Sequence, residues 1–244
     1  MIRVPTPELL DTDAGTPAEI AASLNDLRRI NRWFGGTRTS IDLIRRVASD
    51  DGASGVPARR PSPDVIFPPL RLSLLEIAAG SGYVPQTARN HLAQKGIRLD
   101  VTLLDRVASH VASTPKNGTA AVVADACKLP FCDSSFDLVS SNLFLHHLGP
   151  DELVHCMQEC LRVCRKAVLI NDLIRHPVHM VLVYSGMPLY RSRLTRHDAP
   201  ASVRQAYTKE EMLDMLRRAG AARIEMKSYY LFRMGAIVWK RADG

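Results

Sequence analysis

Residues 74–82 constrain the fold of this chain more than any other stretch. They read L-L-E-I-A-A-G-S-G, an apolar run containing one acid that passes into a series of small residues. A short apolar run of this kind is typical of a strand that is buried on both faces of a parallel sheet. The small residues after it allow the backbone to come close to a bound molecule. We therefore expect a parallel strand over residues 72–77, followed directly by a ligand-binding turn.

Acidic residues stand at the ends of three further apolar segments. Asp105 closes D-V-T-L-L-D, Asp125 closes A-A-V-V-A-D, and Asp137 opens F-D-L-V-S-S-N-L. The carboxyl ends of parallel strands meet at one edge of a sheet, where α/β folds bind their ligands. We therefore expect Asp105 and Asp125 to lie near the glycine-rich turn.

Taken together, these segments resemble the class I S-adenosylmethionine-dependent methyltransferases. The similarity runs from about residue 72 to residue 240, and its most specific part is A-D-A-C-K-L-P-F with F-D-L-V, followed by L-F-L-H-H-L. Within the family, the chain is most similar to the small-molecule branch around ubiquinone and menaquinone biosynthesis. It departs from the family pattern at Ala78, which replaces the first glycine of the turn, at Tyr83, where an acid often stands, and at residues 162–167, where R-V-C-R-K-A replaces R-V-L-R-P-G-G.

The order of the predicted elements agrees with this resemblance. Strand-like and helix-like segments alternate over residues 72–171. This alternation predicts an α/β fold with a doubly wound, mostly parallel sheet and helices on both faces, which the family builds with seven strands. A helix over residues 150–163 and a fifth strand over residues 167–171 complete the alternation. The last two strands, near residues 223–230 and 234–240, are expected to form the C-terminal antiparallel hairpin of the family.

The segment before this fold is expected to form an N-terminal helical cap. Thr16, Pro17 and Glu19 make a capping box with proline at the first helical position, and the two glycines at positions 35 and 36 are expected to end that helix. A second helix is expected to begin at T-S-I-D, residues 39–42. We therefore divide the chain into residues 1–70, a helical cap with a Pro-rich linker over about 50–70, and residues 71–244, the methyltransferase domain. The cap is expected to dock over the site, with Asn31, Arg32 or Trp33 contacting the acceptor.

A long connection, about residues 173–207, separates the fifth strand from the last helix. Connections of this length in a compact domain are often lids or binding elements. This one carries five arginines and a single acid, which favours recognition of a substrate. A structural helix pair with a solvated basic face is the alternative. The residues that we expect to recognise the substrate are Arg175, His176, His179 and Tyr184.

The resemblance implies S-adenosyl-L-methionine as the cofactor and assigns roles along the sheet edge. Glu76 is expected to reach the methionine end, Asp105 the ribose hydroxyls, and Asp125 with the Ala126 backbone the adenine. The remaining cofactor-binding candidates are Ala78, Gly80 and Gly82, which allow close approach, and Asn142 and Leu143, which border the donor. His146 and His147 are candidates for a base that deprotonates a phenol or hydroxyl. No base is needed if the acceptor is an electron-rich carbon or is already ionised.

These observations predict methyl transfer to oxygen or carbon of a small, partly hydrophobic acceptor, such as a quinone, phenol, lipid or secondary metabolite. An NAD-linked oxidoreductase is disfavoured because G-S-G lacks the third glycine of the dinucleotide motif. A nucleic-acid methyltransferase fits the net charge of +7, but S-N-L-F at residues 141–144 replaces the N-P-P-Y motif of base-modifying enzymes. A catalytically silent binding module with the same fold stays open.

Composition limits the remaining possibilities. An odd number of cysteines, five, argues against a disulfide framework. Cys156, Cys160 and Cys164 share one face of a predicted helix and are interpreted as a core stripe, since their spacing matches no common zinc site. No stretch approaches the roughly 20 apolar residues of a membrane span, so we expect a cytoplasmic protein. A metal and a nucleic-acid partner are not expected, and the oligomeric state stays open.

Overall fold

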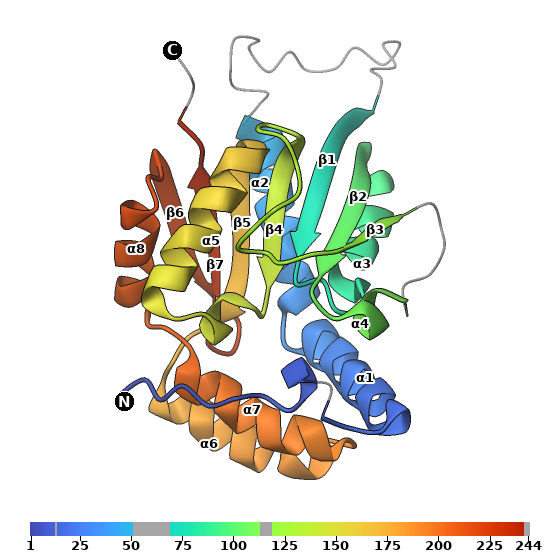
Figure 1. Ribbon diagram of the computed structural model, residues 1–244, viewed down its shortest axis with the longest axis vertical. Coiled ribbons are helices and arrows are strands. Elements are labelled where there is room, and N and C mark those ends of the chain that lie inside the picture. Colours follow the sequence, from blue (N-terminus) through green and yellow to red (C-terminus); the bar gives the residue numbers. More distant parts are fainter. Residues whose placement is uncertain (13, 51–68, 113–118, 242–244) are drawn as a thin grey trace.

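A seven-stranded sheet forms the centre of the molecule (Figure 1). The computed structural model describes residues 1–12, 14–50, 69–112 and 119–241. The strand order is β3-β2-β1-β4-β5-β7-β6, in which β7 runs antiparallel to β5 and β6 and all the other pairs are parallel. The predicted α/β class and the C-terminal hairpin are confirmed. The strands are β1 (Leu70–Ile77), β2 (Ile97–Asp105), β3 (Ala120–Val123), β4 (Phe136–Asn142), β5 (Cys164–Leu173), β6 (Arg223–Tyr229) and β7 (Arg233–Trp239).

Strand β1 is buried on both faces, so its apolar residues enter two separate cores. Leu72 and Leu74 pack with residues of α2 (Gly36–Asp50) and α3 (Tyr83–Ala93) on one face. Leu75 and Ile77 pack with residues of α5 (Pro150–Val163) and α8 (Lys209–Arg218) on the other. Successive side chains of a strand point to opposite faces, so the near-continuous apolar run of β1 holds both helical layers. The short helix α4 (Ala108–Ala112) follows β2.

A third layer covers the carboxyl ends of the parallel strands. It consists of the N-terminal segment with the 3₁₀ turn η1 (Leu10–Thr12), helix α1 (Pro17–Trp33), helix α6 (Pro177–Ser185) and helix α7 (Arg193–Gln205), all at the bottom of Figure 1. We call this the cap layer. Two further 3₁₀ turns are η3 (Leu145–His147), between β4 and α5, and η4 (Met187–Leu189), between α6 and α7.

Polar contacts between buried groups join the two parts of the cap layer. The carboxylate of Asp26 on α1 accepts hydrogen bonds from the backbone N–H groups of Arg191, at 2.7 Å, and Ser192, at 3.0 Å. The hydroxyls of Ser23 and Thr195 are 3.1 Å apart. Segments far apart in the sequence thus form one layer over the sheet edge.

The N-terminal helices follow the sequence prediction only in part. The capping box of Thr16 is present, and Gly35, with φ of 80°, follows the end of α1. The predicted start of the second helix at residues 39–42 was wrong, because α2 begins at Gly36. A Cβ at Gly36 would lie 2.1 Å from Oδ1 of Asn31, so this tight junction has no room for a side chain. Helix α2 covers the sheet itself, and the domain boundary at residue 70 stays a prediction. The Pro-rich linker over residues 51–68 lies outside the described residues.

The cysteine stripe lies in the core. Cys156, Cys160 and Cys164 are fully buried among apolar side chains. Cys164 is the first residue of β5 rather than a helical residue, because α5 ends at Val163. Across the described part of the chain, no helix combines the length and apolar character that crossing a bilayer requires.

Candidate active site

The glycine-rich turn after β1 lies directly beside the end of β2. Ala78 and Gly80 have positive φ angles of 48° and 52°, which glycine adopts freely and alanine only with strain. The N–H of Gly80 donates a hydrogen bond of 2.7 Å to Oδ2 of Asp105. The carboxylate at the end of β2 therefore fixes the position of the turn.

Asp105 is a buried hydrogen-bond acceptor with an exposed fraction of 7%. Burial raises its pKa, but hydrogen bonds from His110 and from the backbone N–H groups of Val107 and Gly80 bring that pKa below its ordinary value. The Val107 bond is 2.9 Å long. The carboxylate is consequently ionised at neutral pH and can accept hydrogen bonds from hydroxyls of a ligand.

Glu76 occupies a drier position near the end of β1, with an exposed fraction of 2%. It accepts hydrogen bonds from the hydroxyl of Ser140 and the amide of Asn142. Burial raises the pKa of Glu76 to about 7, since these two neutral donors offset only part of the lost hydration. A cationic group placed beside this carboxylate would favour its ionised form.

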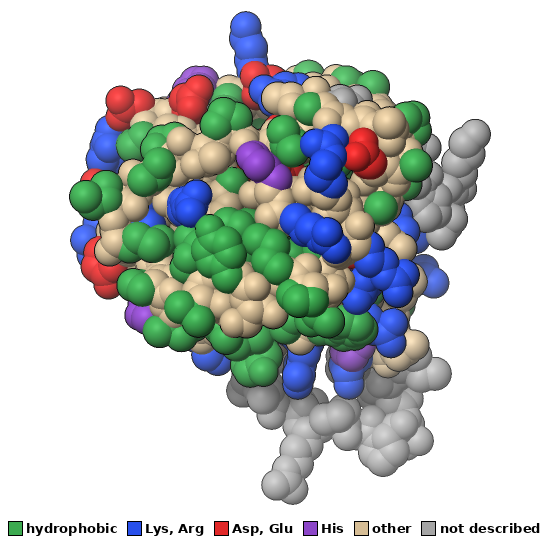
Figure 2. Space-filling view, turned by 90° about the horizontal axis from the view of Figure 1, so that it is seen from below, with side chains coloured by type: hydrophobic (Ala, Val, Ile, Leu, Met, Phe, Trp, Pro, Cys, Tyr) green, Lys and Arg blue, Asp and Glu red, His purple; other side chains and the backbone are tan. Residues whose placement is uncertain are grey.

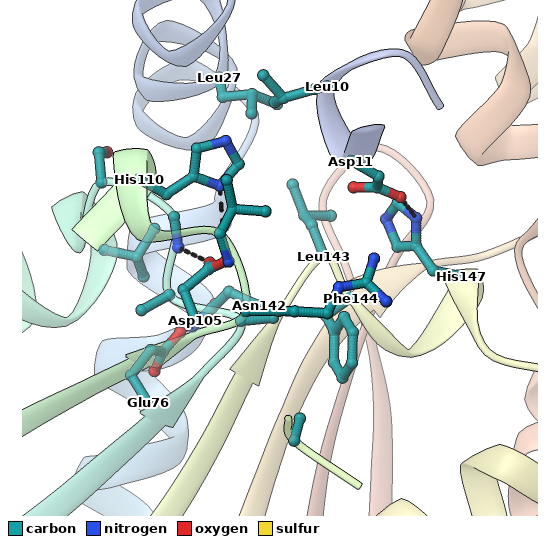
Figure 3. A pocket seen from close by; sticks show the side chains of 18 of the residues that line it. Leu10, Asp11, Leu27, Glu76, Asp105, His110, Asn142, Leu143, Phe144 and His147 are labelled. Carbon is teal, nitrogen blue, oxygen red and sulfur yellow. Dashed lines mark hydrogen bonds and ion pairs between the residues drawn. The ribbon is translucent and has the colours of Figure 1, made fainter. Parts of the chain in front are cut away.

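A cavity of about 400 Å³ opens over these side chains (Figure 3). We call it the donor cavity. Most of the residues predicted to bind the cofactor contribute to its wall, from the ends of β1, β2 and β4 and from the loop after β3. These residues are Glu76, Ala78, Gly80, Asp105, Asp125, Ala126, Asn142 and Leu143.

Gly82 has a packing role, and its predicted contact with the cofactor stays a prediction. It is the N-cap of α3, with φ of 64°, and is not among the described residues that line the donor cavity. A Cβ at this position would lie 2.5 Å from Cδ1 of Leu103. Glycine is therefore required here for close packing of α3 against β2.

A second cavity, of about 360 Å³, lies between the cap layer and the sheet edge. We call it the cap cavity. Its wall is mainly apolar and includes Trp33 of α1 and Val183 of α6. Leu143 has a positive φ of 54°, and Figure 3 shows its side chain extending from the end of β4 toward the cap layer. The residues that line both cavities are Glu8, Leu10, Leu27, Leu143, Leu173 and Ser202.

The two candidate bases are held by carboxylates. Nδ1 of His146 lies 2.6 Å from Oδ1 of Asp172, and Nδ1 of His147 lies 2.6 Å from Oδ2 of Asp11. Burial lowers the pKa of His146, but the charges of Asp172 and Glu8 outweigh it and raise that pKa to about 10. A protonated imidazole does not accept a proton, so this environment argues against His146 as a base. The role of His147 stays a prediction.

The predicted lid residues separate into two groups. His179 lines the cap cavity, and its Nδ1 lies 3.1 Å from the carbonyl oxygen of Ile174. The other three are not among the described residues that line either cavity. Arg175 is buried and donates to Ala206 and Glu211, His176 caps α6, and the hydroxyl of Tyr184 accepts from Arg204. Their roles in substrate recognition remain predictions, which this placement does not support.

The N-terminal segment brings side chains to the site that the sequence analysis did not single out. Glu8 and Asp11 lie beside the two histidines, and Arg28 of α1 donates to the hydroxyl of Ser81 in the turn at 3.4 Å. Of the three cap residues expected at the acceptor, Asn31 lines the donor cavity and Trp33 the cap cavity, whereas Arg32 is not among the described residues lining either. The N-terminal segment carries no catalytic motif, so only its acidic residues could have suggested this role.

Comparison with known proteins supports the resemblance to methyltransferases. Residues 75–170 match a family model described as a methyltransferase domain. The plantazolicin methyltransferase BpumL is 12% identical, and the match covers 96% of this chain and 95% of that one with a TM-score of 0.65. Magnesium protoporphyrin IX methyltransferase from Synechocystis PCC 6803 is 12% identical over 89% and 94% of the two chains, with a TM-score of 0.54. A methyltransferase from Aquifex aeolicus is 14% identical over 70% and 82%, with a TM-score of 0.51.

No curated protein is significantly similar in sequence. At these identities the solved structures establish the fold alone. They confirm the predicted Rossmann-like architecture of class I methyltransferases, and with BpumL the likeness extends over the cap layer as well as the sheet.

Proposed function

We propose that this chain, which has a class I methyltransferase fold and a methyltransferase domain over residues 75–170, transfers a methyl group from S-adenosylmethionine to oxygen or carbon of a small, partly hydrophobic acceptor. The observation that carries the proposal is the hydrogen bond from Gly80 to Asp105. This bond places an ionised acceptor and an open backbone turn on the same wall of the donor cavity.

The residues of the donor cavity fit this cofactor. A Cβ built on Gly80 would meet no atom within 4 Å, so the turn leaves space on its cavity side. Asp105 is placed to accept from the ribose hydroxyls, and Glu76 offers a buried carboxylate to the methionine ammonium group. Asp125 and the backbone of Ala126 line the part of the cavity assigned to the adenine.

Bound there, the cofactor supplies a methyl group already activated by a positively charged sulfur, and the carbon–sulfur bond electrons stay on sulfur when the acceptor takes the methyl. The protein therefore has to align the acceptor and exclude water more than to supply a reactive group. The cap layer meets that need, because α1 and the N-terminal segment cover the sheet edge. Arg28, through its bond to Ser81, connects α1 to the turn itself.

The cap cavity is the proposed acceptor site. Its mainly apolar wall favours a hydrophobic body, and Leu143 lies where the acceptor would meet the donor. Arg233, 2% exposed, also lines this cavity and donates to Oδ1 of Asn171. Burial lowers the pKa of Arg233 to about 10, which leaves it charged at neutral pH. The same wall carries the carboxylates of Glu8, Asp26 and Asp198. An acceptor with an apolar body and a polar group beside Arg233 therefore fits this wall best.

The outer face of the cap layer agrees with a hydrophobic acceptor. Figure 2 shows this face with apolar side chains gathered near its centre and separate basic side chains around them. Helix α6 supplies exposed Val181 and Leu182, and Leu182 also lines the cap cavity. Leu182 therefore connects this apolar face with the proposed acceptor site, whereas Val181 does not line the cavity.

The release of S-adenosylhomocysteine with a panel of phenols, quinols and hydrophobic acids tests the proposal. Val183→Trp would fill the cap cavity and should lower turnover of any accepted compound at least about 100-fold, with the donor Kd within about twofold of wild type. The matched control is Val181→Trp on the exposed side of the same helix. Equal effects of the two substitutions, or turnover confined to nucleic acid, would contradict the proposed acceptor site.

A further inference from the structure

Three side chains with metal-ligand chemistry converge on the wall of the donor cavity. Glu8 comes from the N-terminal segment, and His146 and His147 come from η3. Their ligand atoms all lie within 4.8 Å of one another. Oε1 of Glu8 is 3.6 Å from Nε2 of His146 and 3.9 Å from Nε2 of His147. These separations are too long for hydrogen bonds.

The same separations suit a shared cation. Ligand atoms around a tetrahedral zinc ion lie about 3.4 Å apart, because bonds of about 2.1 Å diverge at the tetrahedral angle. Two imidazole nitrogens and one carboxylate form a donor set that first-row transition metals accept. All three residues line the donor cavity, and Glu8 also lines the cap cavity, so a fourth ligand position would be open to the space between them.

Each imidazole is oriented by a second carboxylate. Asp172 holds Nδ1 of His146 and Asp11 holds Nδ1 of His147, both at 2.6 Å. A carboxylate that accepts a hydrogen bond from the Nδ1–H group orients the ring so that Nε2 points away from it, here toward Glu8. Metal-binding histidines commonly have such a carboxylate partner, which fixes the tautomer and raises the basicity of the ligating nitrogen. Glu8 is held as well, by Ser202 at 2.6 Å and Gln205 at 2.8 Å.

One atom of this group is left without a partner. Nε2 of His146 forms no hydrogen bond with any described residue. The side chain is only 3% exposed, so solvent does not supply a partner either. Burial of an unpaired polar atom costs free energy comparable to a lost hydrogen bond. A metal ion between Nε2 of His146, Nε2 of His147 and Glu8 would replace the proton that the neighbouring carboxylates otherwise favour on this nitrogen. It would give the buried atom a partner and neutralise part of the surrounding carboxylate charge.

We propose that Glu8, His146 and His147 form a binding site for a divalent transition metal ion, with Zn²⁺ as the best match to the donor set. The ion would anchor the N-terminal segment to η3, and this part stands independently of methyl transfer. Its further role rests on the proposed function: an acceptor hydroxyl bound at the open position would lose its proton to solvent more readily. The acceptor would then need no imidazole base.

Titration of the chelator-treated chain of residues 1–244 with Co²⁺ and Zn²⁺, without methyl donor, tests the site. We expect one equivalent of Co²⁺ to bind, with the visible absorption bands of a four-coordinate nitrogen and oxygen site, and Zn²⁺ to displace it. His147→Gln should weaken binding at least about 100-fold, and Asp11→Asn about tenfold or more. His155→Gln, on the exposed face of α5, is the matched control and should bind as wild type does.

Absence of stoichiometric Co²⁺ binding to wild type would overturn the proposal, as would equal weakening by His147→Gln and His155→Gln. Glu8→Gln serves as a second ligand variant if His147→Gln does not fold by circular dichroism. A parallel titration of the wild type with S-adenosylmethionine separates the two proposals. If the wild type does not bind S-adenosylmethionine, the methyltransferase function is contradicted and the metal result is unchanged.

Discussion

The donor cavity and the cap cavity are built in different ways from the same chain. Most of the donor-cavity wall comes from one continuous region, from the end of β1 to η3, where the residues stand at the ends of successive parallel strands. The cap cavity takes its wall from residues 8–34, from α6 and α7, and from the loop between β6 and β7. The first is fixed by backbone topology and the second by the packing of segments distant in sequence.

We call the donor cavity with its strand ends the donor half, and the cap cavity with the cap layer the cap half. The difference between them predicts that substitutions can impair each half separately. Changes in the β1 turn or at the ends of β1 and β2 should affect donor binding with little effect on the cap layer. Changes at the contacts between α1 and α7 should loosen the cap layer with little effect on the donor. Leu143, which lines both cavities, is where the separation should fail.

The largest expected effect is the pH dependence caused by Glu76 in the donor half. Unfolded, its carboxyl ionises near 4.5, whereas burial raises the folded pKa to about 7. Between these values the folded protein holds the extra proton, so this group's contribution to stability is present below about pH 4.5 and is lost as pH rises toward 7. The loss amounts to roughly 3 kcal/mol.

Glu76→Gln isolates this contribution, because glutamine does not titrate. Denaturant unfolding of both proteins from pH 4.5 to pH 8 should show the variant gaining stability relative to wild type as pH rises. In the wild type, donor affinity should also fall about tenfold per pH unit below pH 7, since protonation competes with the ammonium group. A pH-independent difference in stability would show that Glu76 does not carry the raised pKa.

Two glycines of one turn should separate packing from binding. Gly82→Ala places a Cβ 2.5 Å from Leu103 at a positive φ and should destabilise the fold by about 2–3 kcal/mol. Gly80→Ala carries a similar backbone strain but meets no atom within 4 Å, so it should cost about 1 kcal/mol and mainly weaken donor binding. Thermal unfolding and donor titration of both variants check this order. Equal loss of stability would remove the distinction.

A smaller effect is expected in the cap half from Asp26→Asn. The carboxylate accepts from the backbone N–H groups of Arg191 and Ser192 and is 2% exposed. The neutral amide accepts these bonds less strongly, which should cost about 1–2 kcal/mol. Hydrogen exchange should rise in α1 and at the start of α7, while donor affinity stays unchanged. Unchanged exchange in the cap layer would contradict the view that it is held by this contact.

The sequence predicts the donor half well because its signals are local. The bounds of α5 match the prediction over residues 150–163, where Pro150 at the first helical position and the acids after it define the helix start. The alternation of strands and helices likewise predicts the parallel sheet. The predicted start of the second helix was wrong because glycine is typical of a helix end, whereas Gly36 here begins α2.

The cap half and the histidine cluster depend on contacts that the sequence does not encode locally. Glu8 and Asp11 reach His146 and His147 only because the N-terminal segment crosses the sheet edge. Arg175 looks like a binding residue in a basic connection, yet it turns inward to Ala206 and Glu211. Charge counts along a segment do not predict the direction in which its side chains point.

Calorimetric titration with S-adenosylmethionine and, separately, NADH tests the central claim most directly. We predict binding of S-adenosylmethionine alone, weakened about 10–100-fold by Asp105→Asn, which removes a charged acceptor. Asp100→Asn, on an exposed position of the same strand, should leave the affinity unchanged. Binding of NADH in its place, or of neither ligand, would contradict the assignment of this cavity to a methyl donor.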